Sequence, residues 1–121
     1  MDFLEIFNNA EDLVSVAQGE PIIKEGEAGD CLYVLIEGEA DITLHGRSLG
    51  KIHVGEIIGE MALINSEKRS ATVLAATDCK LALINQAAFS SLLQHVPDFS
   101  MHLLQVMADR LKTAYNIIEE K

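Results

Sequence analysis

Two charged residues of opposite sign stand nine positions apart, each next to an apolar run, with the polar residues 65–68 (NSEK) between them. Glu60 follows the run 57–59 (IIG), and Arg69 precedes the run 70–73 (SATV). Arginine is scarce, with three copies in 121 residues. Its planar guanidinium group can bind a phosphate through two parallel hydrogen bonds. Arg69 is therefore the first candidate for binding an anionic ligand.

The residues around Glu60 and Arg69 are also suited to binding a phosphate. Gly59 leaves room for a close backbone approach, and residues 60–63 (EMAL) can form a short helix whose first N–H groups are free to bind an anion. The Ser70 hydroxyl is a further hydrogen-bond donor. Together these groups predict a local phosphate site.

Glu60 needs a different explanation, because a carboxylate repels a phosphate. An ionised carboxylate only accepts hydrogen bonds, so it can bind sugar hydroxyls. In a ribose whose 3′ and 5′ oxygens carry a cyclic phosphate, the 2′ hydroxyl is the one that remains. The alternative is an ion pair between Glu60 and Arg69 with no ligand at all.

The elements that must position these residues are mostly strands. From Leu13 to Asn85, short runs rich in Val and Ile are interrupted every eight or so residues by Gly, Pro, Asn or Asp, as in β-sandwiches and barrels. We expect a single domain over 1–121 with a mainly β fold and flanking helices, namely a double-stranded β-roll (jelly roll) over about 12–85. The expected strands are 13–17, 21–24, 31–37, 40–45, 48–54, 71–77 and 80–84.

After Asn85 the apolar residues fall at helical spacing. Asn85 can cap a helix that runs to about residue 94, and Pro97 is well suited to the first turn of a longer one. We therefore expect C-terminal α-helices over about 86–120. Cys31 and Cys79 lie inside strand-like runs and are expected to be buried small hydrophobic residues.

The overall charge excludes several kinds of partner. Nine Lys and Arg against nineteen Asp and Glu leave a formal net charge of −10, which repels nucleic acids and anionic membrane surfaces. No segment predicts a signal peptide or a membrane-spanning helix, so a cytoplasmic protein is expected. A phosphate can bind only where local donors overcome this field.

The segment around Glu60 and Arg69 closely resembles the phosphate-binding cassette of the cyclic-nucleotide-binding domain family. That family includes the bacterial catabolite activator protein and the regulatory subunits of cyclic-AMP-dependent protein kinase. The resemblance extends to residues 26–38, which are similar to the strand and turn before the cassette. It implies a regulatory domain that binds cyclic AMP or cyclic GMP, with cyclic AMP favoured, and transmits occupancy through its C-terminal helix.

In that family the residue matching Glu60 binds the ribose 2′ hydroxyl, and the one matching Arg69 binds the cyclic phosphate. The resemblance assigns supporting backbone contacts to Gly59, Ala62 and Ser70. It places Ile42 and Leu49 on the pocket wall. The full set of expected ligand-binding residues is Ile42, Leu49, Ile58, Gly59, Glu60, Met61, Ala62, Arg69, Ser70, Ala71, Thr113, Tyr115 and Asn116.

The sequence departs from the family pattern at two places. Lys68 stands where many cassettes have proline. Residues 113–116 (TAYN) replace the Thr-Ser pair with which the bacterial activators reach the base, so Thr113, Tyr115 and Asn116 are alternatives for that contact. The chain has no room for the activators' helix-turn-helix, and we expect no nucleic-acid binding.

Other functions fit the sequence less well. Cupin enzymes share the β-roll, but they need clustered metal ligands, whereas the four histidines are scattered; we expect neither catalysis nor a metal. The four are His45, His53, His95 and His102. An interaction or dimerisation module of the same fold that binds no nucleotide remains the main alternative.

The long C-terminal helix is a candidate for contact with a second copy of the chain. Its apolar residues repeat close to the heptad spacing of a two-helix seam; they are Leu104, Met107, Leu111, Ala114 and Ile118. We expect Phe99, Leu103 and Leu104 to pack on the roll and the later turns to meet a partner. A helix that only covers the core is the alternative.

Overall fold

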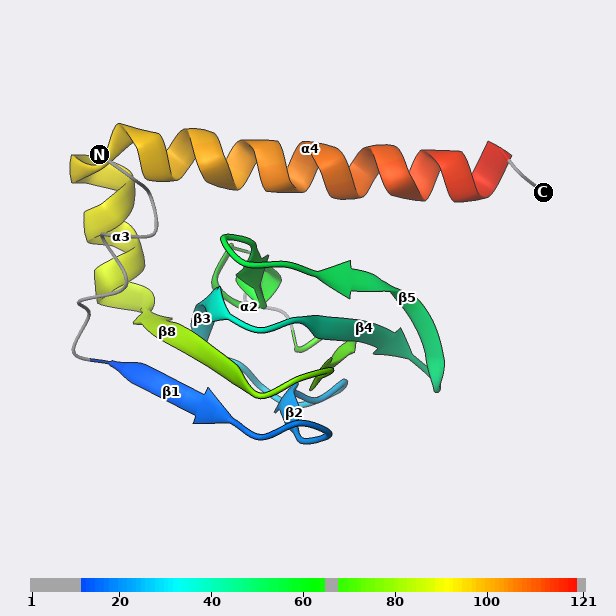
Figure 1. The fold of residues 1–121 in the computed structure, drawn as a ribbon. Helices are drawn as coiled ribbons and strands as arrows, with labels where there is room; N and C mark the ends of the chain where they lie inside the picture. Colours follow the sequence, from blue (N-terminus) through cyan, green and yellow to red (C-terminus); the bar gives the residue numbers. More distant parts are fainter. Residues whose placement is uncertain (1–11, 65–67, 120–121) are drawn as a thin grey trace.

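The computed structural model describes residues 12–64 and 68–119. Eight strands form two four-stranded antiparallel sheets. The first sheet has the order β1 (Leu13–Val16), β8 (Cys79–Asn85), β3 (Cys31–Glu37) and β6 (Ile57–Ile58). The second has the order β2 (Pro21–Ile23), β7 (Thr72–Ala75), β4 (Ala40–Leu44) and β5 (Arg47–Ile52). Figure 1 shows this roll beneath the C-terminal helices, which confirms the expected fold.

The central strand β3 explains how one chain segment supports two cores. Successive side chains of a strand point to opposite faces, and β3 is apolar on both. Leu32 and Val34 belong to the cluster shared with the helices, whereas Leu35 belongs to the cluster between the two sheets. The roll is therefore packed on its inside and on the outer face of the first sheet.

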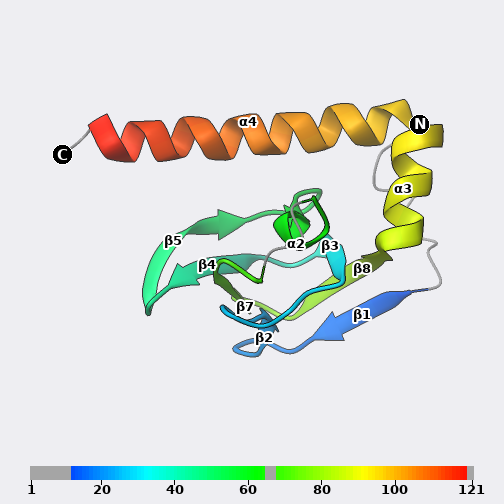
Figure 2. The same cartoon turned by 180° about the vertical axis from the view of Figure 1, so that it is seen from behind.

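The helical part begins where β8 ends. The Asn85 side chain accepts a hydrogen bond from the Ala88 N–H at 2.8 Å, so it caps α3 (Gln86–His95) as expected. The longer helix α4 spans Pro97–Glu119, and Figures 1 and 2 show it crossing the roll after the corner made with α3. Phe89 of α3 and Phe99 of α4 meet edge to face with ring centroids 6.0 Å apart.

The face that α4 turns toward the roll differs from the expected one. Phe99, Leu103 and Val106 are buried, but the expectation that Leu104 packs on the roll is wrong, because 63% of it is exposed. One residue rotates a helix by about 100°, so Leu103 and Leu104 cannot both face the roll. Leu111 is 54% exposed, and the side chains of Ala114 and Ile118 lie outside the described residues.

Cys31 and Cys79 are both buried free thiols, as expected. The short helix foreseen after Gly59 is α2 (Glu60–Ile64). In the part of the chain that the structure describes, no helix combines the length and apolar character needed to cross a membrane.

Candidate functional site

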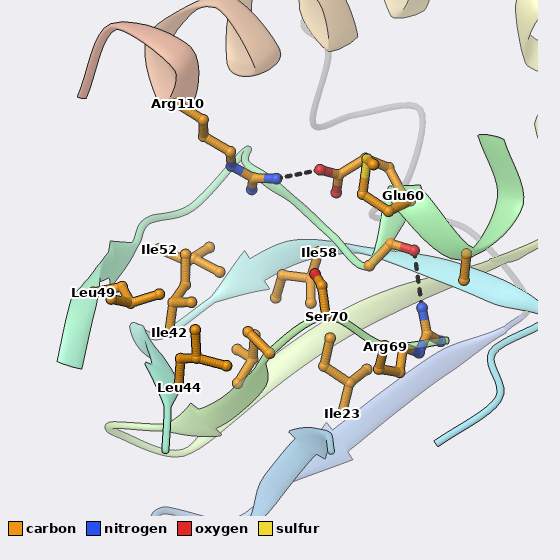
Figure 3. A pocket seen from close by; sticks show the side chains of 15 residues that line it. Ile23, Ile42, Leu44, Leu49, Ile52, Ile58, Glu60, Arg69, Ser70 and Arg110 are labelled. Carbon is orange, nitrogen blue, oxygen red and sulfur yellow. Dashed lines mark hydrogen bonds and ion pairs between the residues drawn. The ribbon is translucent and has the colours of Figure 1, made fainter. Parts of the chain in front are cut away.

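A cavity of about 380 Å³, here called cavity 1, opens between the second sheet and α2. Its size lies within the range of small-molecule sites, roughly 300–1,000 Å³. Figure 3 shows apolar side chains along one part of it and the charged side chains along another. Ten of the expected site residues line it, namely Ile42, Leu49, Ile58, Gly59, Glu60, Met61, Ala62, Arg69, Ser70 and Ala71.

Arg69 is held in place by backbone carbonyls. Arg69 as a whole is only 8% exposed. Nη1 donates to the Gly59 carbonyl at 2.8 Å and Nη2 donates to the Cys31 carbonyl at 2.9 Å. Within the described residues no carboxylate forms an ion pair with it. The guanidinium group is thus fixed, and no neighbour among the described residues neutralises its positive charge.

Two glycines leave the space that this guanidinium group occupies. A Cβ atom on Gly29 would overlap the Arg69 Cζ and Nε atoms, and one on Gly59 would overlap Nη1. Gly59 also has a φ of +82°, a conformation that favours glycine. The sequence pointed to Gly59 but not to Gly29, which there stood only as a turn residue. The turn is tied to Arg69, whose N–H donates to the Glu27 carbonyl at 2.8 Å.

Glu60 opens α2 and is only 4% exposed. Its Oε1 atom accepts a hydrogen bond from Arg110 Nη1 at 2.6 Å, and Arg110 also donates to the Ile57 carbonyl. The alternative of an ion pair between Glu60 and Arg69 is therefore not what the structure contains. Glu60 Oε2 is buried and has no hydrogen-bond partner among the described residues, which is rare for a buried carboxylate.

Arg110 is a charged residue of the site that sequence reasoning missed. It comes from α4, and Figure 3 shows it reaching down to Glu60 across the cavity. The helical spacing could have indicated Arg110, because Arg110 stands seven positions after Leu103 and therefore falls on the same helix face. A charged residue on the buried face of a helix needs a partner.

The wall of cavity 1 away from the charges is aliphatic. It includes Ile42, Leu49 and Ile58, as expected, and also Ile23, Leu44, Ile52 and Val73, which sequence analysis did not single out. These residues come from neighbouring strands of the second sheet and from β6. The cavity thus offers an apolar surface for a ring system beside a charged end.

The residues expected to reach the base do not line cavity 1. Thr113 lines a neighbouring cavity of about 680 Å³, cavity 2, and its hydroxyl donates to the Asp109 carbonyl at 3.0 Å. Asn116 is exposed, and the Tyr115 side chain lies outside the described residues. The base contact stays a prediction for all three.

Tyr33 lies beside the anion end of the site. Burial, together with a hydrogen bond to Cys31, raises its pKa to about 12, while the Arg69 charge acts in the opposite direction. The phenol is therefore neutral near neutral pH and adds no negative charge next to Arg69. Within residues 12–64 and 68–119, no group of three His, Cys, Asp or Glu side chains could hold a metal ion.

Comparison with known proteins places this geometry in a family. The chain is 37% identical over 78 residues to the cGMP-dependent protein kinase egl-4 of Caenorhabditis briggsae, covering 64% of this chain and 10% of the kinase. It is 41% identical over 85 residues to the cAMP-dependent protein kinase regulatory subunit of Yarrowia lipolytica, covering 69% of this chain and 23% of the subunit.

The fold is similar to that of Thermus thermophilus catabolite activator protein, with a TM-score of 0.76 and 28% sequence identity over 89% of this chain and 53% of that one. The chain spans about a tenth of the egl-4 kinase and about a quarter of the Yarrowia lipolytica regulatory subunit. The family described as "Cyclic nucleotide-binding domain" matches residues 13–96. Because that match covers more than half of the chain, this protein belongs to the cyclic-nucleotide-binding domain family.

Proposed function

We propose that this chain is a non-catalytic regulatory domain that binds a 3′,5′-cyclic purine nucleotide in cavity 1. One observation carries the proposal. Within the described residues, a buried arginine without a carboxylate partner and a buried carboxylate oxygen without a donor line the same cavity. An anion and a hydroxyl group on one small molecule would satisfy both.

The ligand's three parts fit three parts of the cavity. The cyclic phosphate binds Arg69, Ser70 and the free N–H groups at the start of α2. The ribose 2′ hydroxyl donates to Glu60 Oε2. The base lies against Ile42, Leu49 and the other aliphatic residues of the wall.

Cyclic AMP is the favoured ligand in this proposal. Relatives named for cAMP and for cGMP are both similar to the chain, so the preference has to come from the lining. Guanine carries a 2-amino donor that needs an acceptor when it is buried. The wall beside the base is aliphatic, and Ser70, a polar residue of the described lining, binds the phosphate in this proposal, so the guanine amino group would lack an acceptor.

Occupancy is transmitted through α4 in this proposal, because Arg110 joins that helix to the ribose site. A hydroxyl group that binds Glu60 changes the surroundings of the Glu60 and Arg110 pair, and hence favours one position of α4 over another. The exposed Leu104 and Leu111 on the same helix favour a second copy of the chain as the partner. A cytoplasmic location stays a prediction.

Calorimetric titration with cyclic AMP and cyclic GMP tests the proposal. The Arg69→Ala variant should lose roughly 2–4 kcal/mol of binding free energy, because the buried phosphate loses its charged partner. Arg47→Ala is the control, since Arg47 is exposed on β5 and should bind like the unaltered chain. Circular dichroism of both variants shows whether they fold. Unchanged affinity in folded Arg69→Ala would exclude the assignment.

A further inference from the structure

Lys68 directly precedes the arginine that is proposed to bind the phosphate, and the proposed contacts give it no role. Burial alternates along this segment, since Lys68 and Ser70 are exposed whereas Arg69 is only 8% exposed. Ser70 also lines cavity 1. The anion end of the cavity is therefore open to water beside Lys68, and a phosphate that approaches Arg69 from solution comes close to Lys68.

The charge on Lys68 is not balanced by a neighbour among the described residues. No carboxylate there forms an ion pair with it, and Glu67, which precedes it, lies outside the described residues. The turn over residues 24–30 (KEGEAGD) lies alongside, because the Gly26 N–H donates to the Arg69 carbonyl at 2.9 Å. Its lysine and its three carboxylates are all exposed. This turn is thus net negative, like the whole chain with its net charge of −10, and Lys68 opposes both.

Attraction between an exposed cation and a phosphate acts at a distance and is weakened by salt. Lys68 and Arg69 are consecutive, so their Cα atoms lie about 3.8 Å apart. The Debye length is roughly 30 Å at an ionic strength of 0.01 M and about 3 Å at 1 M. The Lys68 charge should therefore act on an approaching phosphate at low salt and hardly at all at high salt. Because Lys68 is exposed to water, its attraction to a phosphate that is already bound is weak, so the effect is expected on association.

We infer that Lys68 is an electrostatic steering residue, which speeds the capture of the cyclic phosphate without holding it once bound. This rests on the proposed function, because it presupposes that an anionic nucleotide binds at Arg69. The task is divided between two consecutive cations. Arg69, which is buried and donates to two carbonyls, retains the phosphate, whereas Lys68 offsets the repulsion by the negatively charged chain before the phosphate enters. Many cassettes of the family have proline at this position, so the steering charge comes from this chain's own sequence.

Binding measurements at two ionic strengths test this inference. Stopped-flow mixing with a fluorophore-labelled cyclic AMP gives the association and dissociation rate constants, and calorimetry with unlabelled cyclic AMP gives the Kd. At an ionic strength of about 0.01 M, Lys68→Gln should lower the association rate constant about threefold and Lys68→Glu about tenfold, with the dissociation rate constant changed by less than about 1.5-fold. The Kd should rise by the same factors as the association rate constant falls. At about 1 M, both variants should bind like the unaltered chain, because the charge is screened.

Matched variants separate the charge of Lys68 from its other properties. Lys68→Arg keeps the charge and should bind like the unaltered chain. Arg47→Gln removes one positive charge at the exposed start of β5, outside both cavities, and should change the association rate constant by less than about 1.5-fold.

Two outcomes would overturn the inference. One is an unchanged association rate constant in Lys68→Glu at low ionic strength. The other is a loss of affinity that persists at high ionic strength, which would make Lys68 a direct contact or a structural residue. If the unaltered chain binds neither cyclic AMP nor cyclic GMP, the proposed function fails and this inference fails with it.

Discussion

Arg69 and Arg110 show how one side-chain type takes two roles in a single cavity. Arg69 is held by carbonyl oxygens, which orient a guanidinium group without cancelling its charge. Arg110 is paired with the Glu60 carboxylate, so the pair as a whole is close to neutral. In a chain with a net charge of −10, the attraction for a phosphate therefore depends on Arg69 and the nearby N–H groups.

The free oxygen of Glu60 leads to a prediction about sugar selectivity. The 2′-deoxy cyclic nucleotide should bind at least ~1.5 kcal/mol more weakly than the ribonucleotide, because Oε2 stays buried without a donor. Competition titration measures the difference. In a Glu60→Ala variant the two ligands should bind almost equally, since that variant has no carboxylate to accept a hydrogen bond from the 2′ hydroxyl. The two ligands and two proteins form a double-mutant cycle that isolates this hydrogen bond. Equal binding of both ligands to the unaltered chain would show that Glu60 has another role.

Gly29 is predicted to be a positioning residue for the phosphate site. In Gly29→Ala the new Cβ meets the Arg69 guanidinium group, and displacement of that group should weaken nucleotide binding about tenfold. Gly46→Ala is the control, because Gly46 has a φ of +80° and open space around it. That variant should lower the melting temperature and leave affinity unchanged. A lower melting temperature with unchanged affinity in Gly29→Ala would contradict a positioning role.

Residue types alone were enough to predict one part of the cavity. Glu60 and Arg69 stood out because charged residues that border apolar runs need a reason. Gly29 and Arg110 did not stand out, because their contacts join positions that are 40 and 50 residues apart. Such contacts exist only once β3, β7 and α4 are assembled, so spacing along the chain does not reveal them.

At the scale of elements, α4 attaches to the roll by an apolar stretch followed by one polar anchor. Phe99, Leu103 and Val106 are buried, and Arg110 then bonds to Glu60 and Ile57. Among the later residues whose side chains are described, Leu111, Lys112, Thr113 and Asn116 are exposed. Arg110 is thus the last residue of α4 for which the structure describes a hydrogen bond to the roll.

Removing that anchor should loosen the helix without disturbing α3. In Arg110→Ala the Glu60 carboxylate loses its partner, and amide hydrogen exchange should become faster in residues 107–116. Exchange in α3 should stay unchanged, because α3 packs through Phe89. Lys112→Ala is the control, since Lys112 is exposed on the same helix. Equal exchange in Arg110→Ala and the unaltered chain would show that apolar packing alone holds α4.

Seven of the eight strands, all but β6, and the two longer helices followed from sequence patterns, but the buried face of α4 did not. Apolar residues occur on two faces of this helix, one through Leu103 and one through Leu104. Periodicity indicates that a helix is amphipathic, but it does not show which of two apolar faces packs against a given surface. Here the roll accepts the face that also carries Arg110, because Glu60 pairs with that side chain.

At the scale of the whole molecule, the face of α4 that the roll leaves uncovered can be assigned a role. Leu104 and Leu111 are exposed by 63% and 54% and stand one heptad apart on the same helix face. Exposed apolar residues at this spacing are typical of a two-helix seam, and burying them removes apolar surface from water. This favours a pair of chains joined through α4.

Analytical ultracentrifugation can decide whether the chain dimerises in this way. The unaltered chain should sediment as a dimer, and Leu111→Glu as a monomer, because two buried carboxylates would face each other across the seam. Leu93→Glu should remain a dimer, since Leu93 is exposed on α3 and not on α4. If every sample sediments as a monomer, and hydrogen exchange in residues 104–113 is the same with and without nucleotide, then α4 only covers the core.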